Sequence, residues 1–299
     1  MNNIAMAQAV QKACKSKFRG RNALKSKVVT HYPNNLTREY VRVANTYMTL
    51  LNKTLAEYLP KIRTAIYDER DQMRMDSANE VMDLISNTFM DIQAEFTKRA
   101  TSFDLDGKIR RLSEATRRRS VREWKRVVSA TLGISILEDY YMGEFFGQSL
   151  NQWTANNVNL IKSIPEKTLS EMQTIIREGF TAGKSNTTIG REIQKAYGTN
   201  RKQAQFYARD QMAKLNADLT KEQQQDAGVE EYMWSDSGDQ RVRCRHEELN
   251  GTKHKWNEPP VVDKRTGRKA HPGKDYRCRC VALPVFNLPT LNLPWESEQ

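Results

Sequence analysis

The chain has 299 residues, of which 38% are hydrophobic and 28% charged, and its net charge is +12. This length allows two domains with a core in each, but no apolar run approaches the roughly 18–20 residues of a membrane-spanning helix. The first ten residues lack the charged n-region of a signal peptide, and four cysteines are too few for a disulfide framework, so we expect a protein of a reducing cytosol.

Positive charge is concentrated in three segments. Residues 1–38 contain 8 Lys and Arg and no Asp or Glu, residues 98–126 contain 11 basic against 4 acidic residues, and residues 241–280 contain 12 against 5. Such concentration favours contact with an anion, either nucleic acid or an acidic protein surface; the alternative is a set of solvated faces. The candidate contact residues are Lys12, Lys15, Lys17, Arg19, Arg21, Lys25, Lys27, Arg117, Arg118 and Arg119.

The first half of the sequence predicts a basic arm followed by helices. Residues 1–38 contain helix-interrupting Gly, Pro and Asn residues and no apolar periodicity, which predicts an arm without regular structure. Apolar residues then recur at spacings of three and four from residue 36 to about 96, with a break or kink at Pro60. A further helix is expected to begin at Arg117, so residues 39–150 form a mainly helical N-terminal region.

Residues 151–286 predict a three-helix connector and a small β-module, after a soft boundary near residues 148–165. The capping box Thr168-x-x-Glu171 predicts the start of the first connector helix, which ends at Gly179 or Gly183. Periodicity predicts a short second helix near residues 187–197 and a longer third one from 201 to 225.

The chemistry of the sequence changes to that of strands after Gly228. Tyr232 and Trp234 alternate as on a strand, and Asn250-Gly251 is typical of a hairpin turn because both central positions favour positive φ. A final strand is expected from Cys278 to Phe286. The fold class is therefore α+β.

The last segment, residues 287–299, repeats Asn-Leu-Pro with a period of five. Regularly spaced prolines exclude helix and favour an extended, polyproline-like tail. Leu288, Leu293 and Trp295 would anchor such a tail on a partner. Alternatively, the tail folds back over its own β-module and covers a strand edge.

The order of motifs between residues 165 and 286 is more informative than any one of them. The motifs are Tyr207-Ala208-Arg209-Asp210 on a helix, Tyr232-x-Trp234, Asp239-x-Arg241-x-Arg243, His246, Leu249-Asn250-Gly251, Trp256, His271-Pro272-Gly273, Asp275 and Cys278-Arg279-Cys280. Together they resemble the Mu F-like family of phage head morphogenesis proteins, also called minor head or minor capsid proteins. One departure is Asp210-Gln211, where the family usually has Thr-Glu.

The resemblance implies a structural, non-enzymatic protein of the phage head. It would be located in the virion, and in the host bacterial cytoplasm during assembly, with the portal protein, the major capsid protein or packaged DNA as partners. It would lie at the portal vertex or head interior and assist head assembly, DNA packaging or ejection. The N-terminal helical half carries no part of this resemblance.

The cysteines and histidines of the β-module suggest a structural zinc. Cys244 and His246 are two residues apart, as are Cys278 and Cys280, so neighbouring strands would bring four ligands together as a Cys3His site. His254 or His271 are alternative ligands. The other interpretations are buried free thiols, or a disulfide of Cys244 with Cys278 or Cys280 formed after lysis.

A metal-dependent DNA nuclease is the alternative function. His246, Asn250 and His271 supply the residue types of a His-Asn-His centre, and basic residues would hold DNA. The Pro-rich tail argues against it, because it replaces the helix that should follow the last strand of such a centre.

Overall fold

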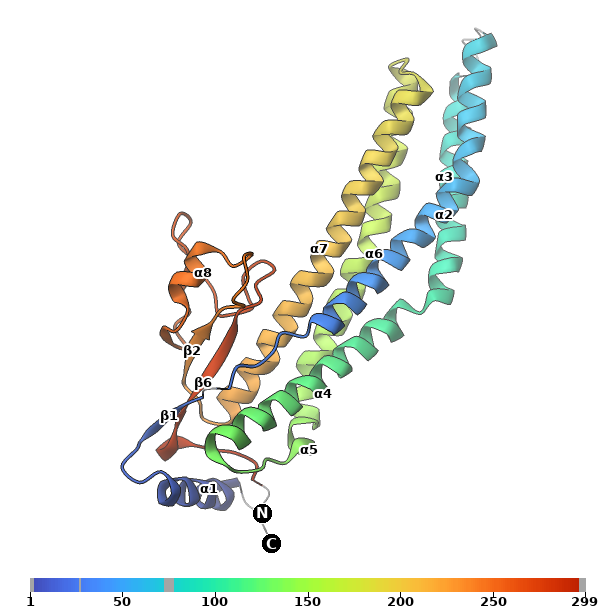
Figure 1. The fold of residues 1–299 in the computed structure, drawn as a ribbon. Coiled ribbons are helices and arrows are strands. Elements are labelled where there is room, and N and C mark those ends of the chain that lie inside the picture. Colours follow the sequence, from blue (N-terminus) through green and yellow to red (C-terminus); the bar gives the residue numbers. More distant parts are fainter. Residues whose placement is uncertain (1–2, 27, 73–77, 296–299) are drawn as a thin grey trace. The chain divides into compact units, whose positions relative to one another are not determined.

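A computed structural model describes the chain except for residues 1–2, 27, 73–77 and 296–299 (Figure 1). The described residues are mainly helical with a small antiparallel sheet near the C-terminal end, so the α+β class is confirmed. The chain divides into two compact units. Unit 1 contains Met1–Thr37, Arg111–Trp153 and Arg209–Gln299, and unit 2 contains Arg38–Arg110 and Thr154–Ala208. Among the described helices, none has both the length and the apolar character needed to cross a bilayer.

Long helices make up the regular secondary structure of unit 2 in the described residues. They are parts of α2 (Asn34–Gln72), α3 (Ala78–Phe103), α4 (Leu105–Leu132), α6 (Glu144–Thr181) and α7 (Asn186–Asp226). The apolar face of α2 is buried as its periodicity predicts, and the buried Tyr40 hydroxyl donates a 2.8 Å hydrogen bond to Asn157 Oδ1 of α6. The predicted break at Pro60 does not occur, because Leu55 and Ile62 stay buried on either side and their packing outweighs the cost of one interior proline.

The predicted three-helix connector is wrong. Helix α6 runs unbroken through Pro165, and Thr168 lies inside it and donates its hydroxyl to the carbonyl of Ile164. Helix α7 also continues where the sequence suggested a break, with Gly198 in its interior. The buried positions of α6, such as Ile161 and Ile164, extend the face that Met172 and Ile176 continue, and this burial outweighs the local capping and proline signals.

The basic arm is also not irregular. Residues Asn3–Lys17 form α1, and Ala23–Lys25 form strand β1. Val10 and Cys14 lie one helical turn apart, are almost completely buried, and join a core cluster against which Phe18 packs. The helix is therefore held by one short apolar stripe, while its lysines lie in solvent.

The sheet of unit 1 joins distant parts of the sequence. Its strand order is β1-β6-β2-β3, with β2 at Glu231–Ser235, β3 at Lys253–Lys255 and β6 at Val281–Asn287, and all pairs are antiparallel. A separate pair consists of β4 (Val261–Asp263) and β5 (Arg268–Lys269). The Asn250-Gly251 turn is present, with φ of 75° at Gly251, but it follows a short helix α8 (Cys244–Leu249) rather than a strand. Figure 1 shows α8 beside β2 and β6.

The described part of the tail belongs to the core of its own chain. The tail begins with a 3₁₀ turn (Leu288–Thr290), and the side chains of Leu288, Leu291 and Leu293 are buried in the cluster that also contains Val10 and Phe286. The backbone pairs further on, because Ile136 forms a β-bridge with Trp295 and Leu137 N–H donates to the carbonyl of Pro294. The tail thus folds back on its own chain, and Leu288 and Leu293 are not available as anchors for a partner.

Candidate metal centre

Two short segments of the β-module bring one histidine and two cysteines together. His246 lies on α8, and its buried ring packs edge-on against Trp234 of β2 with 5.3 Å between ring centroids. Cys278 and Cys280 lie on the segment that leads into β6, and alternation of an extended chain directs both buried thiols to the same side.

The distances within this group match those of a metal site. His246 Nδ1 lies 3.6 Å from Cys278 Sγ and 3.6 Å from Cys280 Sγ, and the three ligand atoms all lie within 4.8 Å of one another. A zinc ion about 2.3 Å from sulfur and about 2.0–2.1 Å from nitrogen, with tetrahedral angles, separates those atoms by roughly 3.5–3.6 Å. This buried group can therefore hold a metal ion.

Asp275 orients the histidine from its other side. Its Oδ2 lies 3.2 Å from His246 Nε2, and its side chain is only 1% exposed. A carboxylate on the second ring nitrogen fixes the tautomer that leaves Nδ1 as the metal-binding atom. Arg243 Nη1 at 3.2 Å and Arg268 Nη2 at 3.0 Å compensate the buried charge of Asp275.

The same contacts shift the proton affinities of the group. Burial acts to raise the pKa of Asp275, but His246, the Tyr276 amide and the two arginines hold it below its usual value. Burial acts to lower the pKa of His246, yet Asp275 and Cys278 raise it to about 9. The hydrogen bond from Cys280, with help from His246, lowers the pKa of Cys278 to about 5, whereas that hydrogen bond and burial raise the pKa of Cys280. One thiolate is thus already favoured before any ion binds.

Cys244 does not join the group. It is the exposed first residue of α8, and residues two apart on a helix point to different sides, so it faces away from the side that His246 presents to Cys278. The sequence predicted a strand here, on which the two side chains would have shared a face. All four cysteines are free thiols in the structure.

The two alternative histidine ligands have other partners. His254 Nε2 lies 2.7 Å from the Thr252 hydroxyl, and His271 Nδ1 lies 2.8 Å from the Tyr232 hydroxyl. Within the described residues, neither belongs to the metal-ligand group. Of the residues proposed for the nuclease centre, His271 thus contacts Tyr232, and Asn250 accepts a hydrogen bond from the Asp236 amide.

Comparison with known proteins finds similarity in the part of the chain that contains this centre. A family model described as phage Mu protein F like protein matches residues 170–283. We refer to these matched residues as the Mu F-like segment. A similar sequence occurs in an uncharacterized protein of Haemophilus influenzae, which is 38% identical over 140 residues, or 47% of this chain and 30% of that protein. No solved structure matches the chain.

The Mu F-like segment contains every residue of the metal-ligand group. His246, Cys278 and Cys280 all lie within the matched range, as does Asp275. Spacing in the sequence pointed to the three ligands, and Asp275 appeared among the family motifs without an assigned role. No sequence signal indicated Arg268, because its contact with Asp275 depends on how the β4–β5 hairpin folds.

Outside the Mu F-like segment, the candidate basic residues fall into different environments. Those exposed on α1, on β1 and between them are Lys12, Lys15, Lys17, Arg19, Arg21 and Lys25. Arg118 is also exposed. Arg117 is 5% exposed and donates to the carbonyls of Tyr141 and Gly143, so its assignment as an anion contact is wrong. Arg119 is partly buried and donates to the His31 carbonyl, and Lys27 lies outside the described residues.

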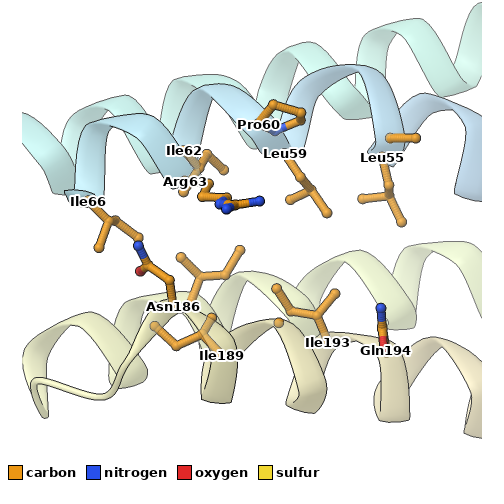
Figure 2. A pocket seen from close by; sticks show the side chains of 13 residues that line it. Leu55, Leu59, Pro60, Ile62, Arg63, Ile66, Asn186, Ile189, Ile193 and Gln194 are labelled. Carbon is orange, nitrogen blue, oxygen red and sulfur yellow. The ribbon is translucent and has the colours of Figure 1, made fainter. Parts of the chain in front are cut away.

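Unit 2 contains an apolar pocket of about 330 Å³ between α2 and α7. Figure 2 shows Leu59 and Ile66 of α2 on one side and Ile189 and Ile193 of α7 on the other. Arg63 supplies the charged side chain of this lining, which is otherwise aliphatic or amide. The pocket lacks convergent polar groups and has the character of a packing gap between helices.

Proposed function

We propose that this chain is a structural minor head protein of a tailed bacteriophage, without enzymatic activity. The match of residues 170–283 to the phage Mu protein F-like family carries this proposal. The protein would reside in the virion, at the portal vertex or head interior, and would contact the portal protein or the major capsid protein. There it would assist head assembly, DNA packaging or ejection.

Purified phage particles provide the test. Quantitative mass spectrometry of separated heads and tails should find the chain in heads, in fewer copies than the major capsid protein. Cross-linking of intact heads should join it to the portal or the capsid protein. A chain that is absent from mature heads and from assembly intermediates would contradict the proposal.

Zinc is the ion that the β-module would hold. Two thiolates and one imidazole are the donors that zinc prefers, and a small sheet with a limited apolar core gains stability when an ion joins α8 to the segment before β6. Elemental analysis of the purified protein should give about one zinc per chain. Cys278→Ser should lose it, whereas the exposed Cys244→Ser should retain it.

The exposed basic residues of α1 and β1 would contact DNA phosphates or an acidic protein surface. If DNA is the partner, binding weakens steeply with salt, and each removed contact lowers the slope of log K against log[salt] by about 1. Replacing Lys12, Lys15 and Lys17 by Gln should therefore flatten the slope. The matched control replaces the exposed Lys53, Lys98 and Lys202 of unit 2. Equal slopes for both triple variants, or no DNA binding at low salt, would exclude the DNA interface.

A further inference from the structure

The metal-ligand group supplies three ligands, one fewer than a closed tetrahedral zinc site requires. The described residues contribute no fourth His, Cys, Asp or Glu to this group. The carboxylate of Asp275 does not supply the fourth ligand through its contact with His246. That contact is to Nε2, on the other side of the ring from the ligand atom Nδ1. Cys244 lies on another side of α8.

A pocket of about 260 Å³ adjoins the three ligands. Its other lining residues are Ser237, Arg241, Val242, Arg243, Arg277 and Arg279. The lining therefore contains four guanidinium groups and no carboxylate. Its volume lies below the roughly 300–1,000 Å³ of pockets for larger ligands and far above the ~30 Å³ share of one water molecule.

Carboxylates beside the pocket contact two of these four arginines closely. Asp239 accepts hydrogen bonds from Arg279, and Asp275 pairs with Arg243. Arg241 has an 80% exposed side chain, and its contact is a 3.7 Å approach to Asp239, which Arg279 already holds more closely. A zinc ion with two thiolates is itself neutral, so the surrounding arginines set the sign of the charge in the pocket.

We infer that zinc in this module keeps an open coordination position toward the arginine-lined pocket, and that an oxyanion of the phosphate class occupies it. This inference rests on the proposed zinc. Phosphate oxygens bind zinc, and the guanidinium fork matches phosphate geometry. A neutral ligand would gain little from a lining with four guanidinium groups and no carboxylate. The source of the phosphate is either a small anion or DNA.

Cobalt substitution makes the open position visible. The full-length protein is loaded with Co²⁺ in place of Zn²⁺, and its visible absorption is recorded during titration with inorganic phosphate. An oxygen ligand that enters the coordination sphere should change the absorption bands saturably. X-ray absorption of the zinc protein should show two sulfur ligands, with nitrogen and oxygen completing the sphere.

Matched variants connect the spectral change to the pocket. Arg241→Ala should raise the dissociation constant for phosphate about three- to tenfold. Arg265→Ala removes the same charge from the exposed turn between β4 and β5 and should leave the constant unchanged. Both positions are exposed, so circular dichroism should show intact folding and elemental analysis an unchanged zinc content.

The outcomes separate this inference from the zinc proposal. Three sulfur ligands in the absorption spectrum, with loss of one in Cys244→Ser, would mean that α8 rearranges to close the site, and the inference would be wrong. Cobalt absorption bands that do not change when phosphate is added would also overturn the inference, while the zinc proposal would stand. A protein that binds no metal would contradict the zinc proposal itself.

Oligonucleotides identify the source of the phosphate. A duplex without terminal phosphates that shifts the cobalt bands would assign the position to the DNA backbone. A shift with inorganic phosphate and with 5′-phosphorylated duplex alone would assign it to a terminal or free phosphate. Either result supports an oxyanion ligand.

Discussion

Arg117 and Arg118 are neighbours in the sequence but occupy different environments. The Arg117 guanidinium is buried and donates to the carbonyls of Tyr141 and Gly143, where it holds the loop after α5 (Glu138–Tyr141), while Arg118 lies in solvent. Arg117→Met should lower the free energy of unfolding by about 2–4 kcal/mol, because the carbonyl of the buried Tyr141 and that of Gly143 lose their donor. Arg118→Met should change it by less than about 0.5 kcal/mol.

Denaturant unfolding followed by tryptophan fluorescence measures this difference. Similar small effects of both substitutions would contradict the structural role of Arg117. The sequence could not separate the two arginines, because a triplet of like residues on a helix does not show which of them faces a polar backbone.

His271 should contribute a pH dependence to stability. Burial, together with Lys221, His254 and Lys274, lowers its pKa to about 4, and the ring contacts the Tyr232 hydroxyl. Between about pH 6.5 and 4 the unfolded chain binds a proton that the folded chain excludes, so stability falls as pH falls through this range. His271→Gln should weaken this fall, which thermal melts of both proteins at pH 7, 6, 5 and 4 would measure. If the melting temperatures of the two proteins fell equally with pH, the contribution of His271 would be contradicted.

The ligand group was predictable to the extent that it depended on local spacing. The alternation of Cys278 and Cys280 on an extended segment gave their common side correctly. The sequence misplaced Cys244, because the six residues of α8 are too few for helical periodicity to stand out against a strand pattern. The role of Asp275 depends on two loops that meet in space, which spacing does not encode.

Among the elements, α7 contains a glycine that its fold does not need. Gly190 lies inside the helix beside the apolar pocket, and a Cβ atom there would meet nothing within 4 Å. Gly190→Ala should therefore raise the stability of unit 2 by about 0.5–1 kcal/mol, because alanine loses less backbone entropy on folding.

Gly228, unlike Gly190, has no room for a side chain and has a backbone conformation that favours glycine. Its φ is +75°, and an added Cβ would collide with the Thr290 carbonyl oxygen. Gly228→Ala should destabilise unit 1. Unfolding followed by far-ultraviolet circular dichroism should show Gly190→Ala at a higher midpoint and Gly228→Ala at a lower one. The interpretation would be wrong if the two substitutions shifted the midpoint in the same direction.

The tail should behave as part of the core. Leu291 is completely buried in the cluster that also contains Val10 and Cys14 of α1. Leu291→Ala should therefore lower the free energy of unfolding of unit 1 by about 2–5 kcal/mol. Leu137, also in unit 1, is 37% exposed and provides the control, for which Leu137→Ala should lower the free energy of unfolding much less. All five tryptophans of the chain lie in unit 1, so fluorescence reports the unfolding of that unit. An unchanged fluorescence midpoint for Leu291→Ala would contradict the placement of the tail.

The elements themselves were predicted better than their ends. Periodicity identified the apolar faces of α2 and α6, whose burial depends on spacing alone. The break expected at Pro60 and the helix start expected at Thr168 do not occur. A proline inside a helix removes one backbone hydrogen bond, whereas each of these long helices buries many side chains. Helix α1 was missed because two buried residues, Val10 and Cys14, are too short a pattern to recognise.

At the scale of the whole molecule, the two units should respond differently to removal of metal. The metal-ligand group lies in unit 1, next to Trp234, and no residue of unit 2 belongs to it. A strong chelator should lower the fluorescence midpoint of unit 1 because the energy of zinc binding is energy of folding. The helical signal of unit 2 should persist. A fluorescence midpoint that the chelator leaves unchanged in a protein shown to contain zinc would contradict this.

The pairing of β1 with β6 has a consequence for the order of synthesis. The paired residues, such as Leu24 and Phe286, are about 260 residues apart in the chain. At about 5–20 residues per second, a ribosome needs roughly 13–50 s to deliver the partner after β1 emerges. During that interval the strand has an unpaired edge, and Val10 and Cys14 of α1 have no core to enter. Unit 1 therefore completes its fold only after translation has passed β6, and the nascent N-terminal segment is the part of this chain that a chaperone would protect.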